Sequence, residues 1–191
     1  MFYALSPKEQ SLRRGQAKVI NFAIIYGMGV FSLAVKLGIS QEDAEKILTA
    51  YFAALPYVKA WKDGMERMVK RTGEIRTLLG RFRKTTMHRH PDRGRAGNAV
   101  RSVINGQIQG GAADIVNTAM TRLYFDETFQ RSGARIVNQI HDELLIDCPK
   151  PWSEKIYELA GYYLCNPFSP HFHLHVPLHV GGCIGPGWEK N

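Results

Sequence analysis

Four side chains near the start of the sequence are spaced four residues apart and could together bind a nucleotide. Arg14 and Lys18 are cationic, and Phe22 and Tyr26 are aromatic. On an α-helix each step of four overshoots one turn by about 40°, so these side chains spread over about 120° and share one broad face about 18 Å long. Cations near a helix N-terminus favour a phosphate tail, and the rings favour a planar base. The alternative is an amphipathic helix whose rings pack in a core while the cations extend to solvent.

A second group of reactive residues lies in the segment Gln139–Glu143. Asp142 and Glu143 are adjacent there, between two apolar-rich runs that read as the strands of a hairpin. Carboxylates exposed at a turn suit a hard cation, and Mg²⁺ takes one or two carboxylates together with substrate phosphates. Asp is also common at hairpin turns, so a polar turn without a metal is the alternative.

Histidines alternate near the end of the chain. His171, His173 and His175 fall in or beside a segment, 173–180, for which we expect a strand, and His179 shares their parity. Alternation places their imidazoles on one face of such a strand. Imidazole is a common metal ligand, but no acid or thiol stands at ligand spacing. We therefore expect an exposed edge or a partner-binding face rather than a metal site.

Basic residues are concentrated in one segment. Lys and Arg number 25 against 17 Asp and Glu in 191 residues, which gives a formal net charge of +8. Residues 67–101 hold eleven cations against two acids, and this surplus of nine (11 − 2) exceeds the net charge of the whole chain. Such density favours contact with a phosphate backbone over an ordinary solvated loop. The eleven are Arg67, Lys70, Arg71, Arg76, Arg81, Arg83, Lys84, Arg89, Arg93, Arg95 and Arg101.

Composition excludes several classes of protein. Hydrophobic residues make up 45% and charged residues 22%, which is typical of a globular chain and excludes wholesale disorder. The longest mostly apolar run, residues 19–37, is interrupted by polar residues and glycines, so we expect no membrane insertion, and no targeting segment is visible. The three cysteines form no CxxC pair, which argues against a disulfide framework or a zinc cluster and favours a reducing interior.

Caps and chain breakers predict the order of the elements. Ser6-Pro7-Lys8-Glu9 is a capping-box sequence, so a helix begins near residue 7 and is expected to break around Ser11 before running on to about Tyr26. Glycines at 106, 110 and 111 indicate close approach of another backbone. Further helices are expected over 30–37, 40–55, 57–70, 98–130 and 153–165, β structure over 74–86, 135–140, 143–148 and 173–180, and a basic loop over 88–97.

These motifs together resemble one known family. Residues 14–27, RGQAKVINFAIIYG, are similar to motif B of family A DNA polymerases, the bacterial polymerase I family, and residues 139–143, QIHDE, are similar to its motif C. The resemblance runs in order from about residue 5 to the end of the chain. Three segments are similar to those that hold the primer-template in this family, namely Thr77–Arg81, Arg101–Asn105 and Gln107–Gly110. Val176–Leu178 with Trp188 is similar to the carboxyl terminus of the family.

The resemblance implies a DNA-directed DNA polymerase that transfers nucleotides from dNTPs to a primer 3′-hydroxyl by a two-metal mechanism with Mg²⁺. Arg14 and Lys18 are implied to grip the triphosphate, with Lys18 also a candidate for protonating the leaving pyrophosphate. Phe22 is implied to lie against the sugar and base, while Tyr26 and Gly27 shape the pocket that tests base-pair geometry.

The resemblance also implies roles at the DNA end of the site. Asp142 is the implied metal ligand and catalytic aspartate, and Glu143 is implied to assist at that site. The implied partners are primer-template DNA and dNTPs. The implied DNA contacts, to the primer terminus or the minor groove, are Arg81, Arg101, Asn105, Gln109 and His141.

Three departures from the family pattern stand out. Ala23 replaces a common Gly, and Gly15 stands where a second Arg is common. The third departure is motif A, an Asp followed by an aromatic, a Ser and an Ile-Glu pair. None of the seven aspartates stands in that context, namely Asp43, Asp63, Asp92, Asp114, Asp126, Asp142 and Asp147.

Two interpretations follow from the missing motif A. In the first, the chain is the C-terminal subunit of a split polymerase, active only with a second subunit that carries motif A and the thumb. In the second, it is a non-catalytic basic nucleic-acid-binding protein or a polymerase remnant. Joint retention of Asp142, Lys18 and Phe22 favours the first, because backbone binding needs only cations. An engineered or proteolytic fragment is a further alternative.

The expected fold class is α+β. We predict a predominantly helical fingers subdomain with the motif B helix over residues 1–73, and a partial palm with an antiparallel sheet and the motif C hairpin over 74–191. The expected location is the cytoplasm of a bacterial or phage-infected cell.

Overall fold

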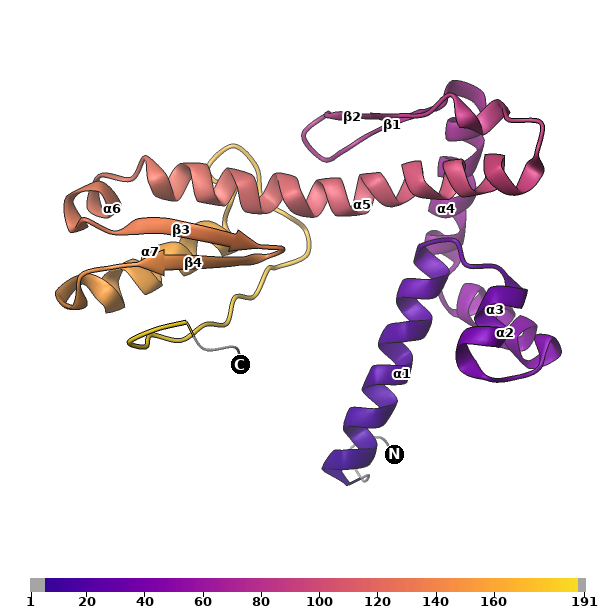
Figure 1. Ribbon diagram of the computed structural model, residues 1–191, viewed down its shortest axis with the longest axis horizontal. Coiled ribbons are helices and arrows are strands. Elements are labelled where there is room, and N and C mark those ends of the chain that lie inside the picture. The colour runs from indigo at the N-terminus through magenta and orange to yellow at the C-terminus, as the bar shows by residue number, and fades with distance from the viewer. Residues whose placement is uncertain (1–5, 189–191) are drawn as a thin grey trace. The chain divides into compact units, whose positions relative to one another are not determined.

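The computed structural model describes residues 6–188 and shows an α+β chain of long helices and two small antiparallel hairpins (Figure 1). The chain divides into two compact units. The first is Met1–Arg76 with Phe82–Gln107, and the second is Thr77–Arg81 with Ile108–Asn191.

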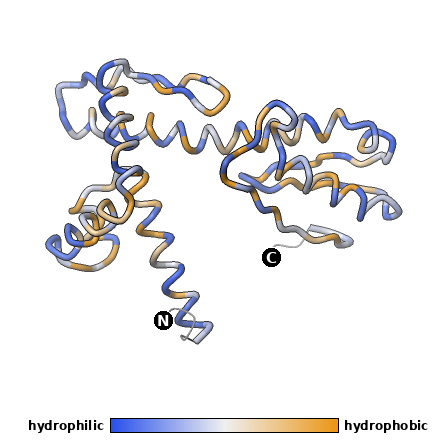
Figure 2. The backbone as a smooth tube through the Cα atoms, turned by 180° about the vertical axis from the view of Figure 1, so that it is seen from behind, coloured by the Kyte–Doolittle hydropathy of each residue, from blue (hydrophilic) through white to orange (hydrophobic). Residues whose placement is uncertain are grey.

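The first helix, α1, spans Pro7–Ile25 without a break, so the expected interruption around Ser11 is wrong. Its start is set by the predicted capping box. The Ser6 hydroxyl accepts from the Glu9 N–H at 3.4 Å, and the Glu9 carboxylate accepts from the Ser6 N–H at 3.0 Å. Figure 2 shows hydrophilic and hydrophobic residues alternating along α1. Among the described side chains of this helix, only those of Ala23 and Ile24 near its end are buried.

Three further helices of the first unit follow their predicted limits closely. They are α2 (Val30–Leu37), α3 (Gln41–Ala54) and α4 (Pro56–Thr72). Gly38 ends α2 and Gly73 ends α4 in the left-handed conformation, while Ser40 caps α3 by accepting from the Asp43 N–H at 3.0 Å. The core of this region consists of Ala23, Leu33, Ala34 and Ala44.

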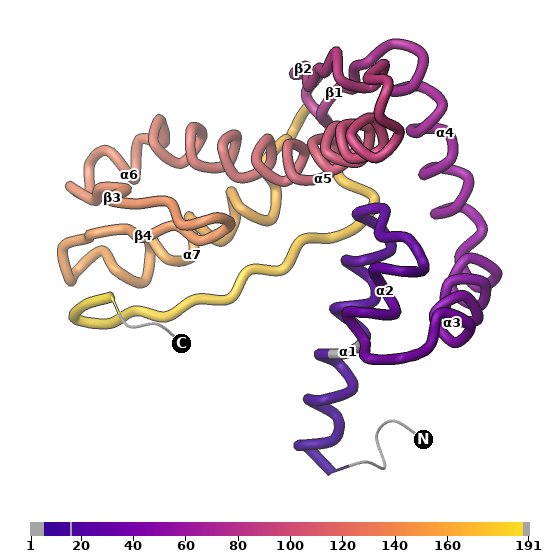
Figure 3. Tube along the Cα trace, turned by 45° about the vertical axis from the view of Figure 1, so that its right-hand side comes forward, coloured from indigo at the N-terminus to yellow at the C-terminus, as the bar shows by residue number. Residues whose placement is uncertain are grey.

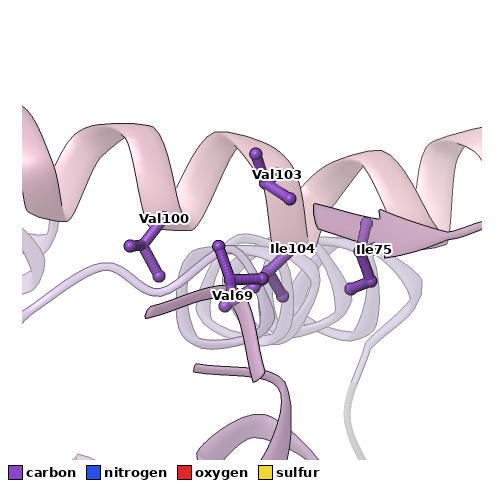
Figure 4. Packing of buried hydrophobic residues seen from close by; sticks show 5 residues of the cluster. All are labelled: Val69, Ile75, Val100, Val103 and Ile104. Atoms are coloured by element: carbon purple, nitrogen blue, oxygen red, sulfur yellow. The ribbon is translucent and has the colours of Figure 1, made fainter. Parts of the chain in front are cut away.

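A second core in the first unit joins α4 to the first hairpin and to the long helix α5 (Arg93–Tyr124). The hairpin strands are β1 (Glu74–Arg76) and β2 (Phe82–Lys84), which pair antiparallel, and a short 3-10 turn, η2 (Met87–Arg89), follows them. Figure 4 shows the buried side chains in close packing, one from α4, one from β1 and three from α5. They are Val69, Ile75, Val100, Val103 and Ile104.

The second unit has its own core around the second hairpin. Its elements are the end of α5, α6 (Glu127–Ser132), β3 (Arg135–Ile140), β4 (Glu143–Asp147), η3 (Lys150–Trp152) and α7 (Ser153–Cys165). β3 and β4 pair antiparallel with a register irregularity between Ile136 and Asn138. The buried members of this core are Leu123, Phe129, Ala134, Ile156 and Ala160.

The structure corrects two expected limits of the long helix. α5 begins at Arg93, inside the expected loop, because Asp92 acts as an N-cap and accepts from the Arg95 N–H at 3.0 Å. The expected helix over 98–130 is in fact two, because Asp126 caps α6 by accepting from the Thr128 and Phe129 N–H groups at 2.7 and 3.1 Å.

The expected strand over 173–180 is wrong. The segment after α7 is irregular, as the yellow part of the trace in Figure 3 shows, and within residues 6–188 it pairs with no strand. The hydroxyl of Tyr157 on α7 donates to the Gly182 carbonyl at 3.2 Å, which attaches this irregular segment to α7. His171, His173 and His175 therefore do not share the face of a strand. Across residues 6–188, no helix has the length and apolar character needed to cross a membrane.

Candidate functional site

The last three side chains of the four-residue series, at the end of α1, are neighbours. The Lys18 ammonium lies 5.9 Å from the centroid of the Phe22 ring. The Phe22 and Tyr26 ring centroids are 5.6 Å apart, with 34° between the ring planes. Arg14 and Lys18 are exposed, and within residues 6–188 neither forms an ion pair. The structure therefore places cations and rings together in the predicted order.

The buried face of α1 is a different one. Ala23 is 3% exposed and Ile24 is 1% exposed, whereas Phe22 is 46% exposed. Phe22 therefore does not pack in the core, as the amphipathic-helix alternative required, and an exposed phenyl ring beside a cation is free to meet a ligand.

Two of the predicted DNA contacts lie one turn apart on the first-unit part of α5. Arg101 donates to the side-chain carbonyl of Asn98 and is half-buried. The side-chain oxygen of Asn105 is buried, and residues 6–188 supply no hydrogen-bond donor to it. An unpaired buried carbonyl is costly, so Asn105 is suited to accept from a group outside the described chain. Gln109 is exposed on the part of α5 that belongs to the second unit.

Arg81 is held at the tip of the first hairpin by a buried acid. Its Nε atom donates to Asp114 at 2.6 Å and its Nη2 atom donates to the Gly110 carbonyl at 3.0 Å. The Leu79 N–H donates to the other Asp114 oxygen at 3.0 Å. Burial alone would raise the pKa of Asp114, but hydrogen bonds from Thr77, Leu79 and Arg81 outweigh it and hold that pKa below its usual range.

The same tip packs closely on the glycines of α5. A Cβ added at Gly110 would lie 2.5 Å from Cγ2 of Thr77, which leaves no room for a side chain. At Gly106, in the first unit, the group that approaches is the side chain of Arg83, 2.8 Å from an added Cβ. Close approach to these glycines is thus confirmed, although hairpin side chains rather than another backbone fill the space at Gly106 and Gly110. At Gly111 the backbone nitrogen of Leu78 does approach, 4.0 Å from an added Cβ.

The second hairpin presents its acids at a two-residue turn. His141 and Asp142 form the turn between the paired residues Ile140 and Glu143. His141 has a φ of 56°, while φ of Asp142 is not positive, so the signs match a type II′ turn. The side-chain amide of Gln139 donates to the His141 carbonyl at 3.3 Å. His141, Asp142 and Glu143 are all exposed and accessible to a ligand.

The turn carries two acidic side chains that are possible magnesium ligands. Carboxylate oxygens are the donors that Mg²⁺ prefers, and those of Asp142 and Glu143 are solvent-accessible. In residues 6–188, however, no three acidic, histidine or cysteine side chains come close enough to hold a metal ion. The donors present fit Mg²⁺ in kind but need further ligands. The α1 series belongs to the first unit and this turn to the second.

Two residues of interest escaped the sequence interpretation. The sequence showed Asp114 only as an aspartate outside motif A. In the structure it accepts hydrogen bonds from Leu79 and Arg81 and so fixes the tip of the first hairpin. Phe82 is 52% exposed and lies between two cations. The alternation of basic and aromatic residues at 81–84 was the available signal for Phe82. No local pattern marks Asp114, because its partners are more than thirty residues away.

Comparison with known proteins identifies the family. The sequence model described as DNA polymerase family A matches residues 3–190. A thermostable DNA polymerase I of Thermus thermophilus is 34% identical over 97% of this chain and 22% of its own length. DNA polymerase I of Geobacillus stearothermophilus is 35% identical over 92% of this chain and 20% of its own length. The chain thus spans about a fifth of the length of these relatives.

A solved structure has a similar fold. The POL domain of Pol1 from M. smegmatis, in complex with DNA primer-template and dNTP, matches with a TM-score of 0.81 and 29% sequence identity. The match covers 91% of this chain and 29% of that one. Agreement of sequence and fold over nearly all of these residues is consistent with the ordered motifs, and we conclude that the chain belongs to the family A DNA polymerases.

Proposed function

We propose that this chain is the part of a DNA-directed DNA polymerase that binds the incoming dNTP. It also supplies some of the metal-binding carboxylates for nucleotidyl transfer. The observation that carries this proposal is the row of Lys18, Phe22 and Tyr26 at the end of α1, in which Lys18 and Phe22 are exposed and Tyr26 is half-buried. Ala23 and Ile24, which lie between the two rings in the sequence, are the residues that α1 buries there. A helix that only packs would bury its largest rings. This row instead has a cation that can bind phosphates and aromatic rings that can contact a base.

Arg14 and Lys18 bind the triphosphate in this proposal. Both are exposed and without an ion pair in residues 6–188, so binding a phosphate breaks no ion pair there. Lys18 lies where negative charge develops on the leaving pyrophosphate, and it is the candidate proton donor. Phe22 lies against the sugar and base, and Tyr26 with Gly27 limits the shape of the base pair.

Asp142 and Glu143 hold Mg²⁺ through their carboxylates in this proposal. Mg²⁺ bound there would supply activation of the primer 3′-hydroxyl and charge stabilisation at the transferred phosphoryl group. A two-metal site would need carboxylates from more than one segment of the chain. Asp142 lies in the turn and Glu143 is the first residue of β4, so the pair does not readily supply both bridges. A motif A aspartate from outside these 191 residues, on the same or on a second polypeptide, therefore completes the site.

Arg81 and Asn105 are two of the proposed DNA contacts. The guanidinium of Arg81 is oriented by Asp114 yet its side chain is 56% exposed, which suits a phosphate contact. The side-chain oxygen of Asn105 accepts from a donor on a base edge, because it has no partner in residues 6–188. Arg101, Gln109 and His141 are the other proposed contacts to the primer terminus or minor groove.

Nucleotide binding by the chain tests the proposal. A fluorescent dNTP is titrated with the wild-type chain and with Lys18→Gln in the presence of Mg²⁺. We expect the variant to bind about tenfold more weakly, since a charge-assisted contact is worth about 1.5 kcal/mol or more. Lys36→Gln on α2, which is equally exposed, is the control and should bind as the wild type does. Equal affinities of the wild type and Lys18→Gln would contradict the assignment of α1.

A further inference from the structure

One face of the first hairpin carries an aromatic ring between two cations. Arg76 on β1 is paired in register with Phe82 on β2, and Lys84 is two residues further along β2, so all three side chains share a face. The guanidinium carbon of Arg76 lies 3.9 Å from the centroid of the Phe82 ring. The Lys84 ammonium lies 4.6 Å from the same centroid.

The opposite face of this hairpin fixes it to the first unit. Ile75 is 1% exposed and belongs to the core with α4 and α5. The aliphatic part of Arg83 lies against Gly106 of α5. The hairpin is thus packed on one side only, and the face that carries Phe82, Arg76 and Lys84 lies open to solvent, with Phe82 52% exposed.

Two cations, Arg76 and Lys84, lie against the same Phe82 ring although their charges repel each other. Like charges repel, and exposed side chains separate when nothing holds them. The negative face of the Phe82 ring attracts both cations, and Glu74 offsets the charge of Lys84 alone, at 3.4 Å. The face keeps a net positive charge inside the segment 67–101, whose surplus of cations is nine. A polyanion is therefore the complementary partner.

We propose that Phe82 is a positioning residue that holds Arg76 and Lys84 as a pair for the sugar-phosphate backbone of DNA. The inference rests on the proposed function, and it locates one of the DNA contacts of that function. Phosphate is favoured over a stacked base because Arg76 already lies in van der Waals contact with the ring. A base could stack there only by displacing it.

Salt-dependent DNA binding tests this inference. A labelled primer-template duplex is titrated with the chain between about 50 and 200 mM salt, and the slope of log affinity against log salt is compared. Arg76→Gln should make the slope shallower by about one, since one phosphate contact is lost. Phe82→Leu, which keeps an apolar side chain, should weaken binding about two- to fivefold, and Phe82→Tyr, which keeps the ring, should restore it.

Controls separate this face from general charge and exposure. Phe31→Leu removes a ring that is 66% exposed on α2, and Lys46→Gln removes an exposed cation on α3. Neither should change the affinity or the slope by as much as the hairpin variants do. Circular dichroism of each variant confirms that the exposed substitutions leave the helices intact.

Each contrary outcome has its own meaning. If the wild type binds with a steep salt dependence but Arg76→Gln and Phe82→Leu bind equally well, the hairpin face is not the contact and the inference is overturned while DNA binding stands. If Phe82→Leu weakens binding to an intact single strand but not to an abasic one, the ring stacks on bases and the positioning role is wrong. If the wild type does not bind DNA at all, both the inference and the DNA contacts of the proposed function fail.

Discussion

The side chain of Arg101 lies directly over Gly27. A Cβ placed on Gly27 would be 2.9 Å from both Cγ and Cδ of Arg101, closer than real contacts allow. Gly27 also has a φ of +76°, in the left-handed region that favours glycine. The end of the proposed nucleotide helix and a proposed DNA contact on α5 are therefore packed against each other within the first unit.

Gly27→Ala should destabilise the chain. The added methyl group meets Arg101 and the left-handed backbone becomes strained, so we expect the free energy of unfolding to fall by about 1–3 kcal/mol. Chemical denaturation followed by circular dichroism measures the change. Gly15→Ala is the matched control, because a Cβ there meets nothing within 4 Å and lies inside α1, so it should stabilise by about 0.5–1 kcal/mol. Equal effects of the two substitutions would contradict the close packing.

Asp114→Asn should lower the stability of the chain at neutral pH by about 1–2 kcal/mol. The substitution removes the charge that Arg81 and the Leu79 N–H bind, and the exposure of Arg81 limits the loss. Glu127→Gln, which breaks a fully exposed ion pair with Arg131, should have almost no effect.

The Asp114 effect should depend on pH in a defined direction. The pKa of Asp114 is lowered in the folded chain, so its contribution is fully present above the unfolded value of about 3.9 and is lost as the pH falls through the folded value. The difference between wild type and Asp114→Asn should therefore shrink in acid. Denaturation at a series of pH values measures it, and a difference that grows toward low pH would show that the pair is not what stabilises the tip.

Much of the helical structure was predictable because local signals set it. Ser6 with Glu9, Ser40, Gly38 and Gly73 mark helix ends within a few residues of where the structure has them. Asp92 and Asp126 carry the same kind of signal. Their role as helix caps was not recognised, because Asp92 lies in a basic segment and Asp126 lies in an apolar pattern. The expected limits of α5 were therefore wrong.

The remaining features depend on contacts distant in sequence. Alternating histidines at 171–175 suggest a strand, but a strand needs a partner, and no neighbouring strand is available in residues 6–188. The order of cations and rings on α1 was predicted from spacing, whereas the exposure of Phe22 depends on α2 and α3 covering the other face of the helix. Asp114 is recognisable only once the hairpin tip lies on α5.

Phe22→Tyr should change the discrimination between nucleotides. With Phe22 against the sugar, a phenyl ring offers no hydroxyl in place of a missing 3′-hydroxyl, so dideoxynucleotides should be poor substrates. The tyrosine hydroxyl should raise the ratio of dideoxy to normal incorporation by about tenfold. The ratio is measured by primer extension with the chain and the polypeptide segment that carries motif A and the thumb. Phe31→Tyr on α2 is the control, and an unchanged ratio in Phe22→Tyr would place Phe22 away from the sugar.

Primer extension with and without Asp142 tests the central claim most directly. The chain alone, the chain with the segment that carries motif A and the thumb, and the same pair with Asp142→Asn are assayed with Mg²⁺, dNTPs and a primer-template. Asp147→Asn, an exposed aspartate at the end of β4, is the control. We predict extension by the pair and by the Asp147→Asn pair, and none by the chain alone or by the Asp142→Asn pair. Robust extension by the chain alone, or undiminished extension by the Asp142→Asn pair, would contradict the account.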